Sequence, residues 1–369
     1  MERVDSVHIP ENKECGQPKT FMKRTHIKAT KAQMQSYFAW LEGKTKGFPS
    51  FKIRFGHHVL ELSFPTQELY EEYKISLKYV YMDSDAAANG AIRFWNTALD
   101  DVLPPGVGEG ANVIEYEGEA GFIRANRYGR WFGAYDMTTH IQYVCFDGRD
   151  LREYSPTWHP FRREFHYFAQ NNGYLYLHSA AVGVDGRGVL LSANGGNGKS
   201  TTALSALTEN MDYVSDDYLI MDTKTRRVYP LYSCGILNSD SLNMLPGLKE
   251  HVIGEVPNRP GRSIIDLLPY WEQFADGMEV CALVCPRVIK GEEVKDPKIV
   301  PDEHKRGKMQ MAVSSARQNG ENQIKGSNFV YRVFDCVKEI PSYELILSKD
   351  TKKNADALKK LIKGELKDV

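Results

Sequence analysis

The sequence RGVLLSANGGNGKST, residues 187–201, is the most informative stretch of this 369-residue chain. Residues 189–192 are an apolar run that follows a turn at 185–188 and another apolar run at 174–184, so both runs are expected to form strands. Residues 199–208 have the composition of a helix. A strand, a glycine-rich turn and a helix in this order are the setting of a phosphate-binding loop. The stretch therefore predicts an α/β fold that holds such a loop.

The glycine-rich turn fits the pattern G-x-x-x-x-G-K-[ST] except at its first position, which is Ala193. Glycine lets the backbone pass close to a polyphosphate, and successive N–H groups at the start of a helix supply partial positive charge. Lys199 is expected to reach the β- and γ-phosphates, and Ser200 to offer its hydroxyl to Mg²⁺. A flexible turn without a ligand is the alternative, which the flanking segments disfavour. The predicted nucleotide-binding residues are Asn194, Gly195, Gly196, Asn197, Gly198, Lys199, Ser200 and Thr201.

Two adjacent acids, Asp216 and Asp217, follow a short apolar run after the loop. One carboxylate of such a pair can hold Mg²⁺, and the other can accept the proton of an attacking hydroxyl. A solvated turn is the alternative, and the nearby loop favours the metal interpretation. His178, on the apolar run before the loop, can orient the base carboxylate or hold the second substrate. Alternatively, His178 is a core residue whose hydrogen bonds are satisfied within the fold.

Together these motifs resemble the catalytic domain of HPr kinase/phosphorylase. They are more similar to the HPr-serine-kinase-like proteins of bacteria, some of which act in peptide-modifying gene clusters. The chain departs from the family at Ala193, where the family has glycine. The resemblance is carried by LHSAAV at 177–182, GVLL at 188–191, the loop at 193–201 and VSDD at 214–217.

The resemblance implies the fold shared with phosphoenolpyruvate carboxykinases, a P-loop kinase core in a mixed α/β domain. It also implies Mg²⁺-dependent transfer of a phosphoryl group from ATP to a hydroxyl, usually that of a serine. In this interpretation Asp216 is the base, with His178 as its partner. Asp217 ligates Mg²⁺ together with Ser200.

Phosphoryl transfer also requires cations near the equatorial oxygens of the phosphate. Arg259 and Arg262 in the loop at 258–262 are candidates, and Arg287 is a catalytic candidate because it follows an apolar strand. Each arginine is otherwise a surface charge. Residues 290–322 are charged and show little periodicity, which favours an irregular excursion near the site, a lid or a docking loop.

The first 150 residues have a different character. Residues 1–30 are polar and predict a loosely held arm, and Thr30 is expected to cap a helix over 31–41. An α+β domain with an antiparallel sheet is expected over 1–150, followed by the kinase-like catalytic domain over 151–369. The expected elements are a hairpin at 51–64, a strand at 75–82, a helix at 86–99 and strands at 111–116, 121–126, 130–135 and 140–146.

The composition narrows the class of protein. Lys and Arg number 47 against 48 Asp and Glu, which argues against a dedicated nucleic-acid binder. No apolar run approaches the ~18–20 residues of a membrane helix, and the N-terminus lacks the apolar core of a signal peptide. Six cysteines without a repeating spacing indicate reduced thiols. We therefore expect a cytoplasmic protein that binds neither nucleic acid nor membrane.

These observations predict a Mg²⁺-dependent kinase that uses ATP or another nucleoside triphosphate. Its acceptor would be a hydroxyl on a peptide, a protein or a small molecule. The first 150 residues would recognise this acceptor or mediate assembly, with a homo-oligomer as one outcome. The alternative is a nucleotide-binding regulatory switch without phosphoryl transfer. A carboxykinase-like enzyme is disfavoured, because the sequence shows no clamp for a carboxylate substrate and no second metal cluster.

Overall fold

The computed structural model describes residues 24–104, 107, 112–127, 129–289, 291–321 and 327–366. Contacts divide the chain into two compact units. The first comprises Met1–Ile53, His58–Lys74 and Met82–Pro156, and the second comprises Arg54–His57, Ile75–Tyr81 and Thr157–Val369. The second unit thus includes two short segments from the N-terminal part of the chain.

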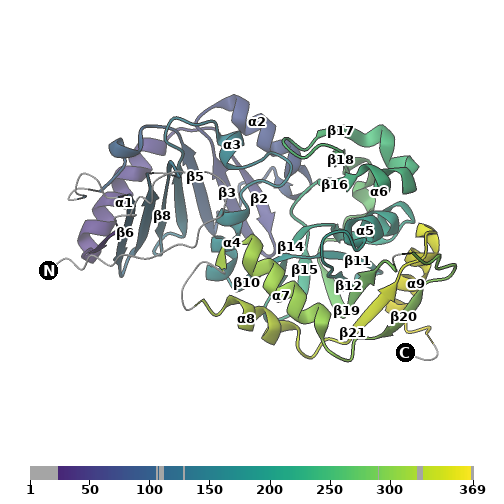
Figure 1. The fold of residues 1–369 in the computed structure, drawn as a ribbon. Coiled ribbons are helices and arrows are strands. Elements are labelled where there is room, and N and C mark those ends of the chain that lie inside the picture. Colours follow the sequence, from purple (N-terminus) through teal and green to yellow (C-terminus); the bar gives the residue numbers. More distant parts are fainter. Residues whose placement is uncertain are drawn as a thin grey trace, which may run out of the picture. The chain divides into compact units, whose positions relative to one another are not determined.

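A nine-stranded mixed sheet forms the framework of the first unit, in the order β1-β6-β7-β8-β9-β5-β3-β2-β4 (Figure 1). Strands β6 to β9 are antiparallel, whereas β1–β6, β5–β9 and β3–β5 are parallel pairs. The antiparallel pairing that the sequence predicts is therefore present from β6 to β9, but the sheet as a whole is mixed. The strands are β1 (Arg24–Lys28), β2 (Ser50–Phe55), β3 (His58–Ser63), β4 (Tyr81–Met82), β5 (Gly90–Trp95), β6 (Val113–Gly118), β7 (Gly121–Asn126), β8 (Trp131–Asp136) and β9 (Ile141–Cys145).

Helix α1 (Lys31–Thr45) begins where the sequence predicts. The Thr30 side chain accepts from the backbone of Gln33, and the Gln33 side chain returns a bond to the Thr30 backbone, which completes a capping box. Met34, Phe38 and Leu41 fall on one side of the helix and are buried in the core that it shares with the sheet. The other helical segments up to residue 156 are α2 (Gln67–Ser76), η1 (Lys78–Val80), η2 (Leu99–Asp101) and α3 (Leu151–Tyr154), of which η1 and the end of α2 belong to the second unit.

Two sequence predictions in the first 100 residues are wrong. The helix expected over 86–99 is replaced by strand β5, whose buried Ile92 and Phe94 lie between β9 and β3. The strand expected over 75–82 is the end of α2, the short η1 and the two-residue β4. At β5, pairing and burial within the folded sheet outweigh local composition.

The second unit contains another nine-stranded mixed sheet, with the path β10-β14-β15-β19-β12-β11-β13 and with β21 joined to both β19 and β20. Pairs β12–β19 and β19–β21 are parallel, and the other pairs of this sheet are antiparallel. The strands are β10 (Tyr174–His178), β11 (Ala180–Val184), β12 (Arg187–Leu191), β13 (Asp212–Ser215), β14 (Tyr218–Asp222), β15 (Arg227–Tyr229), β19 (Met278–Arg287), β20 (Lys298–Pro301) and β21 (Ser342–Ile346).

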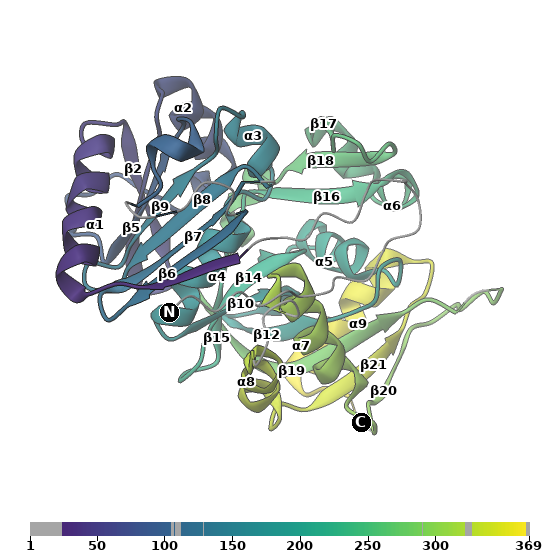
Figure 2. The ribbon, with the colours of Figure 1, turned by 60° about the vertical axis from the view of Figure 1, so that its left-hand side comes forward.

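Helices cover both faces of this second sheet (Figure 2). Helices α5 (Lys199–Thr208) and α9 (Thr351–Lys363) pack on one face, together with Val189 and Leu191 of β12. Helices α7 (Arg306–Gln318) and α8 (Phe329–Val337) pack on the other face, with the intervening Leu190. Because β12 is buried on both faces, it reads as the continuous apolar run that the sequence shows. Helix α4 (Arg162–Asn171) lies next to β10.

The apolar run at 174–184 is two strands rather than one. Ser179 interrupts it, and its hydroxyl donates to the carbonyl of Leu191 at 2.9 Å. Strand β10 then pairs with β14, while β11 pairs with β12 and β13. His178 is the last residue of β10 as a result.

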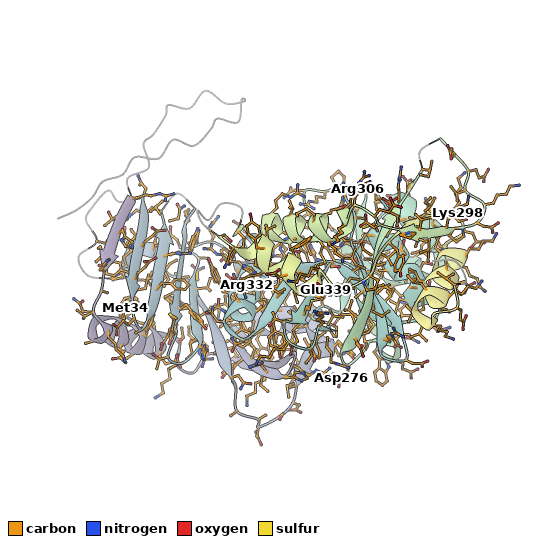
Figure 3. The ribbon with its side chains drawn as sticks, turned by 90° about the horizontal axis from the view of Figure 1, so that it is seen from below. Met34, Asp276, Lys298, Arg306, Arg332 and Glu339 are labelled. Carbon is orange, nitrogen blue, oxygen red and sulfur yellow. The ribbon has the colours of Figure 1, made fainter. Side chains whose placement is uncertain are left out.

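The segment 290–322 is more regular than its composition indicates. It contains β20, whose first residue Lys298 is labelled in Figure 3, and α7, which begins at the labelled Arg306. Met311 and Ala312 of α7 are buried against the sheet. The expectation of an irregular excursion is therefore wrong for most of this segment.

A smaller three-stranded antiparallel sheet, β16-β18-β17, completes the second unit. The remaining elements are β16 (Cys234–Asn238), α6 (Ser239–Met244), η3 (Pro246–His251), β17 (Val252–Glu255), β18 (Arg262–Asp266) and η4 (Leu268–Gln273). None of the helices formed by the described residues combines the length and the apolar content that crossing a bilayer requires. Five cysteines are free thiols, and Cys15 lies outside the described residues.

Candidate nucleotide-binding site

The glycine-rich turn connects the end of β12 to the start of α5, as the sequence predicts. Gly196 and Gly198 have φ angles of 86° and 87°, in the left-handed region that favours glycine. The backbone N–H of Asn197 donates to the carbonyl of Asn194 at 3.2 Å, and that of Thr202 donates to the carbonyl of Gly198 at 2.8 Å. The chain thereby turns directly into α5, with Lys199 and Ser200 in the first turn of the helix.

Replacing Gly198 with alanine is expected to lower the free energy of unfolding by about 1–2 kcal/mol, the cost of a left-handed conformation for a residue with a Cβ atom. The new Cβ would also lie 2.6 Å from Cδ1 of Leu347, so the loop would have to shift. Gly195→Ala is the matched control, because no atom lies within 4 Å of the added Cβ. Denaturant titration of both variants measures the difference. Equal loss of stability would contradict this account of the turn.

A cavity of about 860 Å³ opens over this turn. Of the predicted nucleotide-binding residues, all but Asn197 line it. His178 and Asp217 line it as well, and so does Arg262 at the start of β18. Other parts of the wall come from the end of β16 with α6, from residues 288–294 apart from 290, from residues 347–349 and from the start of α9.

Lys199 ties the loop to the acidic turn between β13 and β14. Its Nζ donates to the carbonyl of Asp216 at 2.9 Å and to Oδ1 of Asp217 at 3.0 Å. The hydroxyl of Ser200 donates to the same Asp216 carbonyl at 3.4 Å. The motifs that the sequence places apart therefore meet at the N-terminus of α5.

Asp217 is the member of the acidic pair that faces the cavity. Nε2 of His178 lies 2.8 Å from its Oδ1, and Nδ1 of His159 lies 3.6 Å from its Oδ2. Burial by itself raises the pKa of Asp217, but the Lys199 charge and the His178 hydrogen bond lower this pKa well below the usual range. The carboxylate is therefore ionised.

Asp216 is turned into the protein and is only 1% exposed. The hydroxyl of Tyr213 donates to its Oδ1 at 3.1 Å, and the backbone N–H of Ile236 donates to its Oδ2 at 3.3 Å. Burial, and secondarily the Asp217 charge, raise the pKa of Asp216 to about 6. Its carboxylate is not part of the cavity wall.

The partner expected for His178 is therefore wrong, since its hydrogen bond goes to Asp217 and not to Asp216. Adjacent residues of this turn present their side chains to opposite sides, and the sequence does not say which side is the cavity. Burial and the Lys199 charge lower the pKa of His178, and burial lowers the pKa of His159 to about 4. Both rings are neutral at pH 7.

The structure does not bring the three candidate arginines together. Arg287 is half exposed, and its Nη1 lies 3.2 Å from Oε2 of Glu344. Among the residues described, the cavity wall includes Arg262 but neither Arg259 nor Arg287. The catalytic role expected for Arg287 is therefore not supported by its position.

Several residues at the site escape sequence reasoning. Tyr213 and Ser314 carry no motif, and His159 resembles a core histidine in the sequence. Ser241, whose hydroxyl lies 2.7 Å from that of Thr201, comes from α6. These groups reach the site through the packing of separate elements. The one local signal is a histidine in the apolar run that precedes the loop, and it applies to His178 alone.

The donor set of the cavity fits Mg²⁺. No group of three or more His, Cys, Asp or Glu side chains forms a metal cluster within the described parts of the chain. Magnesium does not require one, because it takes few protein oxygens and completes its shell with phosphates and water. The Ser200 hydroxyl and the carboxylates of Asp217 and Asp240 line the cavity and are hard oxygen donors.

Comparisons with known proteins give little guidance. No protein-family model matches the chain, and no curated protein matches it significantly in sequence. A solved structure to which it is similar is the HPr(Ser) kinase/phosphatase from Coxiella burnetii, at 14% identity and a TM-score of 0.23. The match covers 47% of this chain and 85% of that one. A likeness at this level says nothing about activity, which has to be inferred from the site.

Proposed function

We propose that the second unit is a kinase that transfers the γ-phosphoryl group of ATP, or of another nucleoside triphosphate, to a hydroxyl. The observation that carries this proposal is the contact of Lys199 with Asp217 at 3.0 Å. Both residues line the cavity whose wall also includes the glycine-rich turn. A cation for the phosphates and a carboxylate for the acceptor are then adjacent, which phosphoryl transfer requires. The motifs that resemble HPr-serine-kinase-like proteins lie at this same place, and we propose the chain as a divergent relative of them.

The turn and the start of α5 would hold the polyphosphate. The backbone N–H groups of the turn and the positive end of the ten-residue helix attract phosphate oxygens. Lys199 lines the cavity, so its ammonium can exchange Asp217 for the β- and γ-phosphates when a nucleotide enters. Arg262, on the same wall, is the candidate for a second cation.

Asp217 rather than Asp216 is the proposed proton acceptor, because it is the member of the pair that reaches the cavity. The acceptor oxygen forms a bond to the γ-phosphorus, the bond from that phosphorus to the β,γ-bridging oxygen breaks, and the hydroxyl proton passes to Asp217. Of the groups that lower the pKa of Asp217, Lys199 is the strongest. Movement of Lys199 to the phosphates therefore raises this pKa and makes the carboxylate a better base.

Ser200 would hold Mg²⁺ together with the nucleotide's own phosphates. The metal, when bound, neutralises charge on the phosphate oxygens. The family resemblance assigns Asp217 to the metal, but Lys199 and His178 already occupy its Oδ1. The proton-acceptor role suits it better.

The proposal is tested with the full chain, Mg²⁺ and ATP labelled at the γ-phosphate. We expect nucleotide binding by calorimetry, and label transfer to a serine-containing peptide, a protein of a cell extract or a small alcohol. Omission of Mg²⁺ should abolish the transfer. Binding without hydrolysis and without any labelled acceptor would favour a regulatory switch. Absence of nucleotide binding would contradict both functions.

A further inference from the structure

Helix α7 places two adjacent serines against His178. The hydroxyl of Ser315 accepts from the backbone N–H of His178 at 3.0 Å, and the hydroxyl of Ser314 lies 2.5 Å from its Nδ1. Ser315 is buried and holds the end of β10 in place. Ser314 instead touches the imidazole ring on the side opposite to Asp217. The role assigned to His178 above does not use this contact.

The two contacts of the ring fix where its proton lies. Oδ1 of Asp217 belongs to an ionised carboxylate, which only accepts hydrogen bonds, so Nε2 must carry the hydrogen. In a neutral imidazole Nδ1 is then an acceptor, and the Ser314 hydroxyl is the donor that meets it. Burial and the charges of Lys199 and Arg162 lower the pKa of His178 more than its contact with Asp217 raises it, so the ring is neutral at pH 7. The ring of Tyr218 packs beside it with centroids 5.3 Å apart.

We infer that Ser314 is a positioning residue: by donating to Nδ1 it holds the ring of His178 in the orientation in which Nε2–H meets Asp217. The chain of bonds runs from the Ser314 hydroxyl through the imidazole to Oδ1 of Asp217. With Oδ1 held in this way, Oδ2 is the oxygen left for the acceptor hydroxyl. The tautomer follows from the hydrogen bonds alone, whereas its consequence for turnover rests on the proposed kinase function.

The direct test is ¹⁵N NMR of the full chain with labelled histidine, with the His178 signals identified by their loss in His178→Gln. In the natural protein we expect a protonated Nε2 and an unprotonated Nδ1. Ser314→Ala removes the donor to Nδ1, so the Nδ1 signal should move to the position of an unprotonated nitrogen without a hydrogen bond, while Nε2 stays protonated against Asp217. Ser314→Thr keeps a hydroxyl and should restore the Nδ1 signal of the natural protein. A protonated Nδ1 in the natural protein, or unchanged signals in Ser314→Ala, would overturn the inference.

The second readout is turnover. Because Ser314 acts through His178 on the proton acceptor, Ser314→Ala should lower kcat by about tenfold, the scale of groups that orient a functional histidine, and leave the KM for nucleotide unchanged. Ser314→Thr should recover most of the rate. A variant that alters the NMR signals without altering kcat would overturn the catalytic part. If no acceptor is ever phosphorylated, the kinase proposal fails while the NMR result still decides the tautomer.

Discussion

Lys199→Met should lower the rate of phosphoryl transfer by on the order of 10²–10³-fold, the loss seen when one preorganised donor to developing negative charge is removed. The reason is that Lys199 is the cation that begins α5 and that lies 3.0 Å from Asp217, inside the cavity. Methionine keeps most of the side-chain volume and removes the charge. Nucleotide binding should weaken as well, because the phosphates lose their main charged partner.

Steady-state kinetics with labelled ATP, together with calorimetric titration of the nucleotide, measure both effects. Lys353→Met is the matched control, since Lys353 is half exposed and pairs with Asp296 on the surface. Thermal unfolding of both variants shows whether the fold is retained. A folded Lys199→Met protein with undiminished transfer would contradict the placement of the phosphates over this helix.

Asp217→Asn is expected to lower transfer by about 10²–10⁴-fold, the usual contribution of a positioned general base. The amide keeps the shape of the carboxylate but cannot take the proton of the acceptor. Nucleotide binding should persist, because Lys199 is freed from its ion pair and remains available for the phosphates. A fall in kcat with retained nucleotide affinity is therefore the signature of this variant.

Asp216→Asn is the comparison that separates the two acids. Its Oδ1 can still accept from Tyr213, but its amide nitrogen would face the N–H of Ile236, with an expected cost of about 1–3 kcal/mol in unfolding free energy. Transfer by the folded fraction should remain well above that of Asp217→Asn. If a folded Asp216→Asn protein lost transfer while Asp217→Asn kept it, Asp216 would be the base, as the family resemblance implies.

Local features of the chain can be recognised from the order of its residues. The glycine-rich turn needs left-handed backbone at Gly196 and Gly198, and a lysine and a serine follow at the start of a helix, so its conformation is encoded within a few neighbouring residues. The cap of α1 by Thr30 is local in the same sense. The α/β character of the second unit follows from strand-like runs on either side of these signals.

Features that depend on distant neighbours do not follow from local patterns. Residues 86–99 have a helical composition, yet β5 is a central strand because β9 and β3 pair with it on either side. The charged segment 290–322 folds into β20 and α7 because a few apolar residues meet the sheet. Ser179 breaks an apolar run into two strands through a bond to β12, which no local pattern indicates.

The same distinction between local and distant neighbours applies to the residues of the site. The residues that can bind a phosphate lie next to one another, since a turn and a helix start form one anion site from consecutive N–H groups, and the sequence alone identifies them. Which aspartate faces the cavity, and which serine holds His178, depends on elements as much as 136 residues apart in the chain. Those contacts exist only after β10, β14 and α7 pack together, because a side chain's direction and burial are set by its neighbours in space.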